Sequence, residues 1–270
     1  MELGFSSLSL FMKSLEEILE VATNDGFDLI EILCEGPYWP RNLLNQGNNG
    51  VEKITEYNAK LNNMDLEIFD SYDIKVMLHS PTIDLNAGSM NKGIRKETEK
   101  QTKEALDLGS KIGAVAITTH PGLVYRREER IRNLAIEFAI DTLGNCQKYA
   151  EELGIVFSVE NMPNKPNFLA NSPKEHSLIV ESIGSSATID WGHANTYETP
   201  NEFLNIPNIS YFHLNDNMGK KDSHLPLGKG TADFSLSFLN TVKRGIIELN
   251  DYENVLKGKK YIFDKLKSVN

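Results

Sequence analysis

The chain has 270 residues, a formal net charge of −10 and two cysteines, Cys34 and Cys146. This length predicts one large α/β domain over residues 1–270, whose core needs no disulfide. The widely separated cysteines are typical of reduced thiols in a cytoplasmic protein, and no apolar run is long enough to span a membrane. The acidic charge argues against non-specific nucleic-acid binding, although bound metal ions would offset part of it.

Short apolar segments bounded by turn residues predict eight strands. In chain order they are Glu2–Ser6, Asp28–Leu33, Ile74–Leu78, Ala114–Thr119, Ile155–Val159, Ala187–Ile189, Ile209–Phe212 and Gly245–Ile247. Helical patterns lie between them: Ser14–Asn24, Val51–Asp70, Gly93–Ile112, Arg127–Leu153, one segment after Ser172, one after Thr199, and Tyr252–Lys267. Ser14 and Glu17 match a capping box. Residues 34–50 are rich in proline, glycine and asparagine and are predicted to form a long loop.

Strands alternate with helices along the whole chain, which predicts a parallel sheet with helical crossovers. Eight such units favour a single (β/α)8 barrel, the TIM-barrel fold. A doubly wound sheet is the alternative, but it gathers ligands at one switch point. Here the unusual polar residues follow strands three to eight, and a barrel brings those six strand ends into one ring.

Nine histidines and carboxylates lie at or just beyond these strand ends. They are His79, His120, Glu160, Asp190, His193, His213, Asp222, His224 and Glu248. Imidazole nitrogens and carboxylate oxygens suit zinc, manganese or ferrous iron, and the lack of thiolates among them argues against a purely structural zinc. Nine ligands exceed the needs of one ion, so the set predicts two or three ions. The remaining histidine, His176, falls inside a helix and is expected to be solvated.

The candidate ligands lie in short motifs: HSPTIDLN at His79, THPG at His120, VEN at Glu160, IDWGHA at Asp190, FHLND at His213, DSHLPLGKG at Asp222, and IIEL at Glu248. Together these motifs resemble the endonuclease IV family (AP endonuclease family 2) within the xylose-isomerase-like TIM barrels. The resemblance runs from Glu2 to the last helix. All nine metal-ligand positions of that family have a residue of matching type here.

The resemblance implies a cluster of three ions, zinc or alternatively manganese, that cleaves DNA 5′ to abasic sites. In that family pattern His79, His120 and Glu160 would hold one ion. The second would share Glu160 and take Asp190, His213 and Glu248, and the third would take His193, Asp222 and His224. Such clusters activate water and neutralise charge on both the attacking and the leaving oxygen.

The match is weaker in the residues that would contact DNA. The family carries an aromatic side chain three residues after its first histidine ligand, where this chain has Thr82. Trp39 and Arg41, in the loop after the second strand, are candidates for a wedge and a phosphate contact. Lys229, near Asp222 and His224, is a further candidate for binding phosphate.

A sugar or sugar-phosphate isomerase or epimerase of the same barrel group is the alternative enzyme. In that case Glu160, Asp190, His213 and Glu248 would hold one Mn²⁺ or similar ion. Glu160 and Glu248 would then be the catalytic acid–base pair beside a carbonyl. This alternative leaves His79, His120, Asp222 and His224 without a required metal role. A metal-binding protein without catalysis ranks last, because the open mouth of a barrel suits a closed structural site poorly. No protein partner is inferred.

Overall fold

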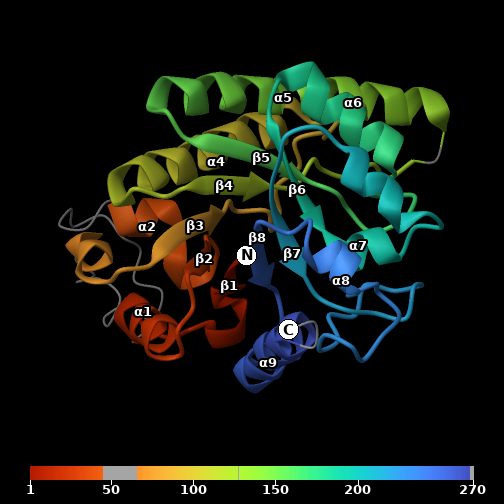
Figure 1. Ribbon diagram of the computed structural model, residues 1–270. Coiled ribbons are helices and arrows are strands. Elements are labelled where there is room, and N and C mark those ends of the chain that lie inside the picture. Colours follow the sequence, from red (N-terminus) through yellow and green to blue (C-terminus); the bar gives the residue numbers. More distant parts are fainter. Residues whose placement is uncertain (45–65, 127, 268–270) are drawn as a thin grey trace.

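The computed structural model describes residues 1–44, 66–126 and 128–267 of the chain. Its eight parallel strands close into a barrel surrounded by helices (Figure 1). The strands are β1 (Glu2–Ser6), β2 (Leu29–Leu33), β3 (Lys75–His79), β4 (Ala116–Thr119), β5 (Val156–Glu160), β6 (Ser186–Asp190), β7 (Ile209–Leu214) and β8 (Arg244–Ile247). The predicted (β/α)8 barrel is confirmed. Because β1 pairs with β8, the doubly wound alternative is excluded.

The outer layer consists of helices whose ends follow local sequence signals. They are α1 (Leu15–Asn24), α2 (Pro40–Leu44), α4 (Lys92–Ile112), α5 (Glu129–Leu153), α6 (Pro173–Ile183), α7 (Trp191–Asn195), α8 (Leu236–Leu239) and α9 (Tyr252–Lys267). Ser14 and Glu17 form the predicted capping box at the start of α1. Gly113 and Gly154 end α4 and α5 in the left-handed backbone region, at φ angles of 67° and 69°, where a Cβ atom is unfavourable.

Two connections differ from the predictions. The loop predicted over residues 34–50 contains a 3-10 turn, η2 (Gly36–Tyr38), and the short helix α2. Pro40 occupies the first position of α2, where its missing N–H has no cost, and Leu43 is buried. The segment after Thr199 forms a 3-10 turn, η4 (Pro200–Asn205), in place of an α-helix.

The predicted helix Val51–Asp70 falls mostly outside the described residues. Its last part lies within a 3-10 turn, η3 (Leu66–Ser71). A further 3-10 turn, η1 (Ser7–Leu10), follows β1. Among the described segments, no helix is both long and apolar enough to cross a membrane. Cys34 and Cys146 are buried free thiols.

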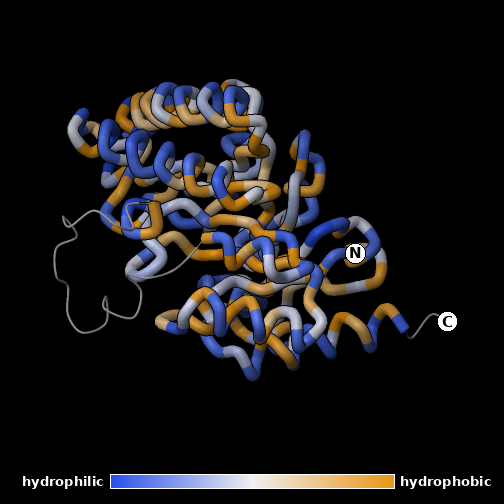
Figure 2. Tube along the Cα trace, turned by 90° about the vertical axis from the view of Figure 1, so that its left-hand side faces the viewer, coloured by the Kyte–Doolittle hydropathy of each residue, from blue (hydrophilic) through white to orange (hydrophobic). Residues whose placement is uncertain are grey.

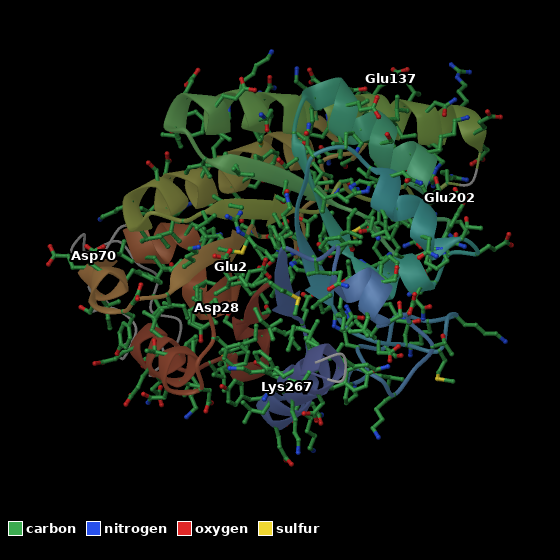
Figure 3. All side chains as sticks on the ribbon, in the orientation of Figure 1. Glu2, Asp28, Asp70, Glu137, Glu202 and Lys267 are labelled. Carbon is green, nitrogen blue, oxygen red and sulfur yellow. The ribbon has the colours of Figure 1, made fainter. Side chains whose placement is uncertain are left out.

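Hydrophobic residues lie both between the sheet and the helices and inside the barrel. Along the outer helices, hydrophobic and hydrophilic residues alternate (Figure 2), as expected for helices with one face on the barrel. Charged side chains such as Asp70, Glu137 and Lys267 lie at the periphery (Figure 3). Inside the barrel, one apolar layer is formed by Leu29, Met77, Ala116, Tyr211 and Ile246.

A polar layer covers this apolar layer toward the carboxyl ends of the strands. Side chains two positions apart on a strand point to the same face. Each residue of the apolar layer is therefore followed, two positions later, by a polar residue on the inner side: Glu31, His79, Thr118, His213 and Glu248. The strand period thus places ionisable groups at one end of a closed barrel, above an apolar floor.

His176 is buried, so the prediction that it is solvated is wrong. It lies in the second turn of α6, on the face that packs against the barrel, and its Nε2–H donates to the carbonyl of Val159 at 2.9 Å. Its Nδ1 has no hydrogen-bond partner. Burial lowers the pKa of His176 from 6.5 to about 4, so the ring is neutral at neutral pH.

We expect His176 to make the protein acid-sensitive. Because the folded-state pKa lies below the unfolded value, the unfolded chain takes up the proton first. The stabilisation is complete above pH 6.5 and is lost as the pH falls toward 4. The difference between 6.5 and about 4 corresponds to about 3 kcal/mol of unfolding free energy. Denaturant unfolding at pH 7 and pH 4.5 should show this loss in the native chain and not in His176→Gln, whose amide can still donate to Val159. Equal pH dependence in both proteins would contradict the assignment.

Candidate metal centre

The structure brings the nine predicted ligands together at the carboxyl end of the barrel. His79, Glu160 and Asp190 are the last residues of β3, β5 and β6, while His120 and Glu248 directly follow β4 and β8. His213 lies within β7, His193 lies in α7, and Asp222 and His224 lie in the loop after β7. The nine side chains fall into three groups in which the candidate ligand atoms lie within 4.8 Å of one another.

The first group contains His79, His120 and Glu160. The Nε2 atoms of His79 and His120 lie 3.4 and 3.2 Å from Glu160 Oε2. His79 Nδ1 lies 2.9 Å from the carbonyl oxygen of Ser80, which can only accept, so this nitrogen carries the proton. The other nitrogen of His79 is therefore directed at the group with its lone pair available. His120 is the most open of the nine ligands, with 32% of its side chain exposed.

The second group contains Glu160, Asp190, His213 and Glu248. His213 Nδ1 lies 3.0 Å from Glu160 Oε1 and 3.4 Å from Glu248 Oε2. Asp190 is held in place by Asn215, whose side-chain amide donates to Oδ2 at 2.8 Å. Glu160 thus belongs to both groups, with one oxygen facing each of them.

The third group contains His193, Asp222 and His224. Both histidines place Nε2 at 3.3 Å from Asp222 Oδ2. Their Nδ1 atoms face backbone carbonyls, of Asn161 for His193 and of Glu248 for His224. His224 has a positive φ of 44°, an uncommon conformation for a residue with a Cβ atom. A strained backbone conformation of this kind persists only where the surrounding contacts hold the residue in place.

The electrostatics of the site match a place for cations. Burial opposes the charged form of His79 and His193, but adjacent carboxylates raise their pKa values to about 9 and about 10. His224 is likewise raised to about 10, chiefly by Asp222 acting against burial. Burial raises the pKa of Asp190 to about 7. In the protein alone, protons on the histidines therefore balance the carboxylates.

The residues fit divalent metal ions. His79, His193 and His224 would each present an unprotonated Nε2 once an ion replaces the proton there. Each of the three groups also contains at least one carboxylate. Asp222 Oδ1 is buried without a hydrogen-bond partner, and a bound cation would satisfy it. Nitrogen and oxygen donors without thiolate suit zinc, manganese or ferrous iron.

Asp216, which the sequence analysis missed, organises the loop that carries the third group. Its buried carboxylate accepts the backbone N–H groups of Gly228, Gly230 and Ala232 at 2.8 to 3.0 Å. A Cβ atom at Gly230 would lie 2.2 Å from the carbonyl oxygen of Asn217, so only glycine fits there. The loop carrying Asp222 and His224 is thus held by one carboxylate that is not itself in a metal group.

The other ligand-supporting residues that sequence reasoning missed are Asn161, Asn215 and Glu31. Both asparagines stand next to predicted ligands, within the VEN and FHLND motifs. Glu31 is fully buried in β2, a strand of otherwise aliphatic residues. A lone carboxylate two positions beyond the inward-facing Leu29 is a signal that could have identified it.

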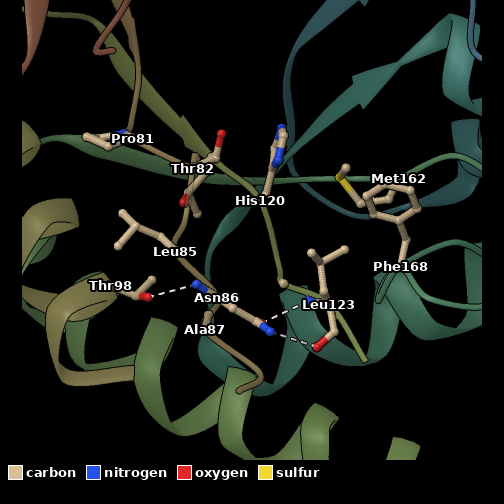
Figure 4. Close-up of a pocket in the computed structure, with 12 residues that line it drawn as sticks. Pro81, Thr82, Leu85, Asn86, Ala87, Thr98, His120, Leu123, Met162 and Phe168 are labelled. Carbon is tan, nitrogen blue, oxygen red and sulfur yellow. Dashed lines mark hydrogen bonds between the residues drawn. The ribbon is translucent and has the colours of Figure 1, made fainter. Parts of the chain in front are cut away.

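A cavity of about 60 Å³ lies beside the first group. Figure 4 shows Thr82, His120 and Phe168 around it. Asn86 joins two of its walls, because its side-chain amide donates to the carbonyl of Leu123 and its side-chain oxygen accepts the Leu123 N–H. The cavity has room for about two water molecules or a small substituent of a bound molecule.

Two of the three predicted substrate-binding residues have side-chain partners on α4. Trp39 donates its indole N–H to Gln101 on α4 at 2.9 Å. Arg41 forms a bidentate ion pair with Glu104, which also lies on α4, and the shortest nitrogen–oxygen distance is 2.8 Å. Lys229 is exposed in the loop after β7. Substrate binding by these three residues stays a prediction, and for Arg41 it would require breaking the pair with Glu104.

The chain is thus a closed (β/α)8 barrel whose carboxyl end gathers histidines and carboxylates that could hold divalent metal ions. Residues 19–254 match the family described as xylose isomerase-like TIM barrel, and the chain belongs to that family. Two uncharacterized proteins of Methanocaldococcus jannaschii, MJ1311 and MJ1614, are 29% and 31% identical to it. They cover 100% and 93% of this chain, which in turn covers 91% and 93% of theirs.

Two further matches carry the names of different kinds of enzyme. A solved structure described as a D-tagatose 3-epimerase-like protein is 28% identical to this chain, with a TM-score of 0.82. The match covers 100% of this chain and 98% of that protein's chain. A protein named probable endonuclease 4, from Thermoplasma acidophilum, is 25% identical over 59% of this chain and 60% of its own. The sequence match to the probable endonuclease 4 therefore covers less of this chain than the structural match to the epimerase-like protein does.

Proposed function

We propose that this protein is a metal-dependent phosphodiester hydrolase of the endonuclease IV type, with three divalent ions at its centre. The observation that carries the proposal is the complete third group of His193, Asp222 and His224. An isomerase that uses one ion has no need of these residues. The buried unpartnered oxygen of Asp222 and the strained backbone of His224 also favour a functional role for this group.

The chemistry follows from how the residues are held. Bound divalent ions would activate water and neutralise charge on the phosphate and the leaving oxygen. Glu160 links the first two groups, because one of its carboxylate oxygens faces His120 and the other faces His213. His120, the most exposed ligand, marks the side from which a substrate would enter.

DNA with an abasic site is the substrate we propose. This choice rests on the resemblance to the endonuclease IV family, in which all nine ligand positions match. Lys229, in the same loop as Asp222 and His224, offers a positive charge for a phosphate. The other cationic candidate, Arg41, already pairs with Glu104, so Lys229 is the better phosphate contact.

A sugar epimerase is the second candidate, and the similarity to the epimerase-like structure over the whole chain favours it. In this case the second group alone would bind metal. Glu160 and Glu248 would exchange a proton with a carbon next to a carbonyl, as acid and base. The net charge of −10 also suits a small neutral sugar better than DNA.

We expect purified protein to bind more than one divalent ion per chain, up to one for each of the three groups. It should nick a duplex that contains one abasic site, and a chelator should abolish the reaction. The matched substrate is the same duplex without the abasic site, which should remain intact. Metal analysis and gel-based nicking measure both results.

The opposite pattern would favour the epimerase. A single bound ion, no nicking and turnover of a ketose would reject the hydrolase. Nicking that persists after complete removal of metal would reject both candidates, because each depends on at least one ion.

A further inference from the structure

We propose that Glu31 is a positioning residue that fixes which nitrogen of His213 faces the metal centre. Glu31 projects from β2 into the barrel and is fully buried. Its Oε2 lies 3.0 Å from His213 Nε2 and 2.8 Å from the hydroxyl of Tyr211. It therefore joins a strand that supplies none of the nine ligands to a ligand on β7.

His213 differs from three of the other histidines of the centre in what faces its ring nitrogens. In His79, His193 and His224, a backbone carbonyl receives the Nδ1 proton and leaves Nε2 for the group. Within the described part of the chain His213 has no carbonyl in this role, and both of its nitrogens face carboxylates. If Nε2–H donates to Glu31, the lone pair of Nδ1 is directed at Glu160 and Glu248.

Tyr211 holds Glu31 in this arrangement. Its hydroxyl donates to the same oxygen that faces His213, and its ring belongs to the apolar layer below. The phenol cannot leave that layer without opening a cavity, so the position of the carboxylate follows from the packing of the barrel floor. The series Tyr211, Glu31, His213 then extends from the apolar floor to the metal centre.

The other oxygen of Glu31 argues against a purely structural role. Glu31 Oε1 is buried and has no hydrogen-bond partner. An unsatisfied buried polar atom destabilises a fold, whereas a neutral side chain of similar size would avoid this penalty. A carboxylate is favoured here only if its negative charge acts on a neighbour, and His213 is the ligand it contacts.

The inference rests on metal binding by the second group, which both candidate functions share. The test compares Glu31→Leu, Glu31→Gln and Tyr211→Phe in the full-length chain, with Glu35→Gln as the control. Glu35 is also buried near the end of β2, but it accepts the N–H groups of Thr82 and Ile83. The affinity for Zn²⁺ is measured by competition with a chelator, and thermal unfolding is measured without metal.

We expect Glu31→Leu to lower the Zn²⁺ affinity of the second group, which contains His213, by about 10- to 100-fold. Glu31→Gln should have a smaller effect, because its amide oxygen can still accept from Nε2–H, and Tyr211→Phe should fall between Glu31→Gln and the native protein. Glu35→Gln should bind Zn²⁺ within about threefold of the native protein. Without metal, Glu31→Gln should unfold at a lower temperature than the native chain while remaining folded at the assay temperature, because it weakens the buried pair with His213.

Nitrogen-15 NMR of the imidazole rings supplies a readout that does not depend on activity. The zinc-loaded native protein should show His213 protonated at Nε2 and ligated at Nδ1, and this signature should change in Glu31→Gln. Native Zn²⁺ affinity in both Glu31 variants, or an unchanged His213 spectrum, would overturn the inference. If the native chain itself bound no metal, the proposed function would fail first, so the two failures are distinguishable.

Discussion

Replacing Glu160 by glutamine is expected to lower turnover by about a thousandfold, equivalent to about 4 kcal/mol of transition-state stabilisation. Glu160 is 1% exposed and lies within 3.4 Å of His79, His120 and His213. The amide cannot carry the negative charge that both the first and the second group share. The loss should appear for either candidate reaction, because both use this residue.

Metal content and stability separate this effect from misfolding. Glu160→Gln should bind fewer ions per chain than the native protein while keeping its circular dichroism spectrum. The control is Glu137→Gln, an exposed glutamate on α5 (Figure 3), which should retain full activity and full metal content. A Glu160→Gln protein with native metal content and native turnover would contradict the shared-ligand assignment.

Replacing His224 by alanine is expected to abolish the ion of the third group and to lower DNA nicking by about a hundredfold or more. The residue contacts Asp222 at 3.3 Å, and its other nitrogen is bound to the carbonyl of Glu248 at 2.9 Å. Asp222→Asn should reproduce the loss, since it removes the charge that both histidines of the group face. Metal analysis and nicking assays measure the two effects together.

Ser223→Ala supplies the matched control, because this exposed residue lies between Asp222 and His224 in the same loop. It should nick DNA and bind metal like the native protein. If His224→Ala retains native activity on its substrate, the third group is not used and the one-ion epimerase becomes the better assignment. The experiment therefore decides between the two candidates at a single residue.

The barrel was predictable because its signals are local. Each strand is a short apolar run with turn residues on both sides, and the helices end at glycines such as Gly113 and Gly154. The meeting of the nine candidate ligands at one end of the barrel was predictable for a related reason. In a closed parallel barrel all strands end on the same face, so a histidine such as His79 at one strand end must meet a carboxylate such as Glu160 at another.

Other features depend on contacts between distant segments. His176 has a place in a helix that the sequence predicts, but its burial depends on which face of α6 meets the barrel. The short helix α2 lies in a segment dominated by loop-forming residues. Its Leu43 is buried through contacts with other parts of the fold, which the local sequence does not reveal. Arg41 carries a charge that suits phosphate, yet Glu104, 63 residues later, is its partner.

The amino-acid sequence by itself determined the strand order, the closed architecture and the types of candidate ligand. The reason is that strand periodicity and strand ends depend on residues that are close together in the sequence. The family resemblance already implied the division of these candidate ligands into three groups, and the structure brings the same groups together. Only the tertiary structure decided which nitrogen each histidine presents. The proton on an imidazole goes to whichever acceptor the fold places beside it. For His213 that acceptor is Glu31, which lies 182 positions earlier in the chain.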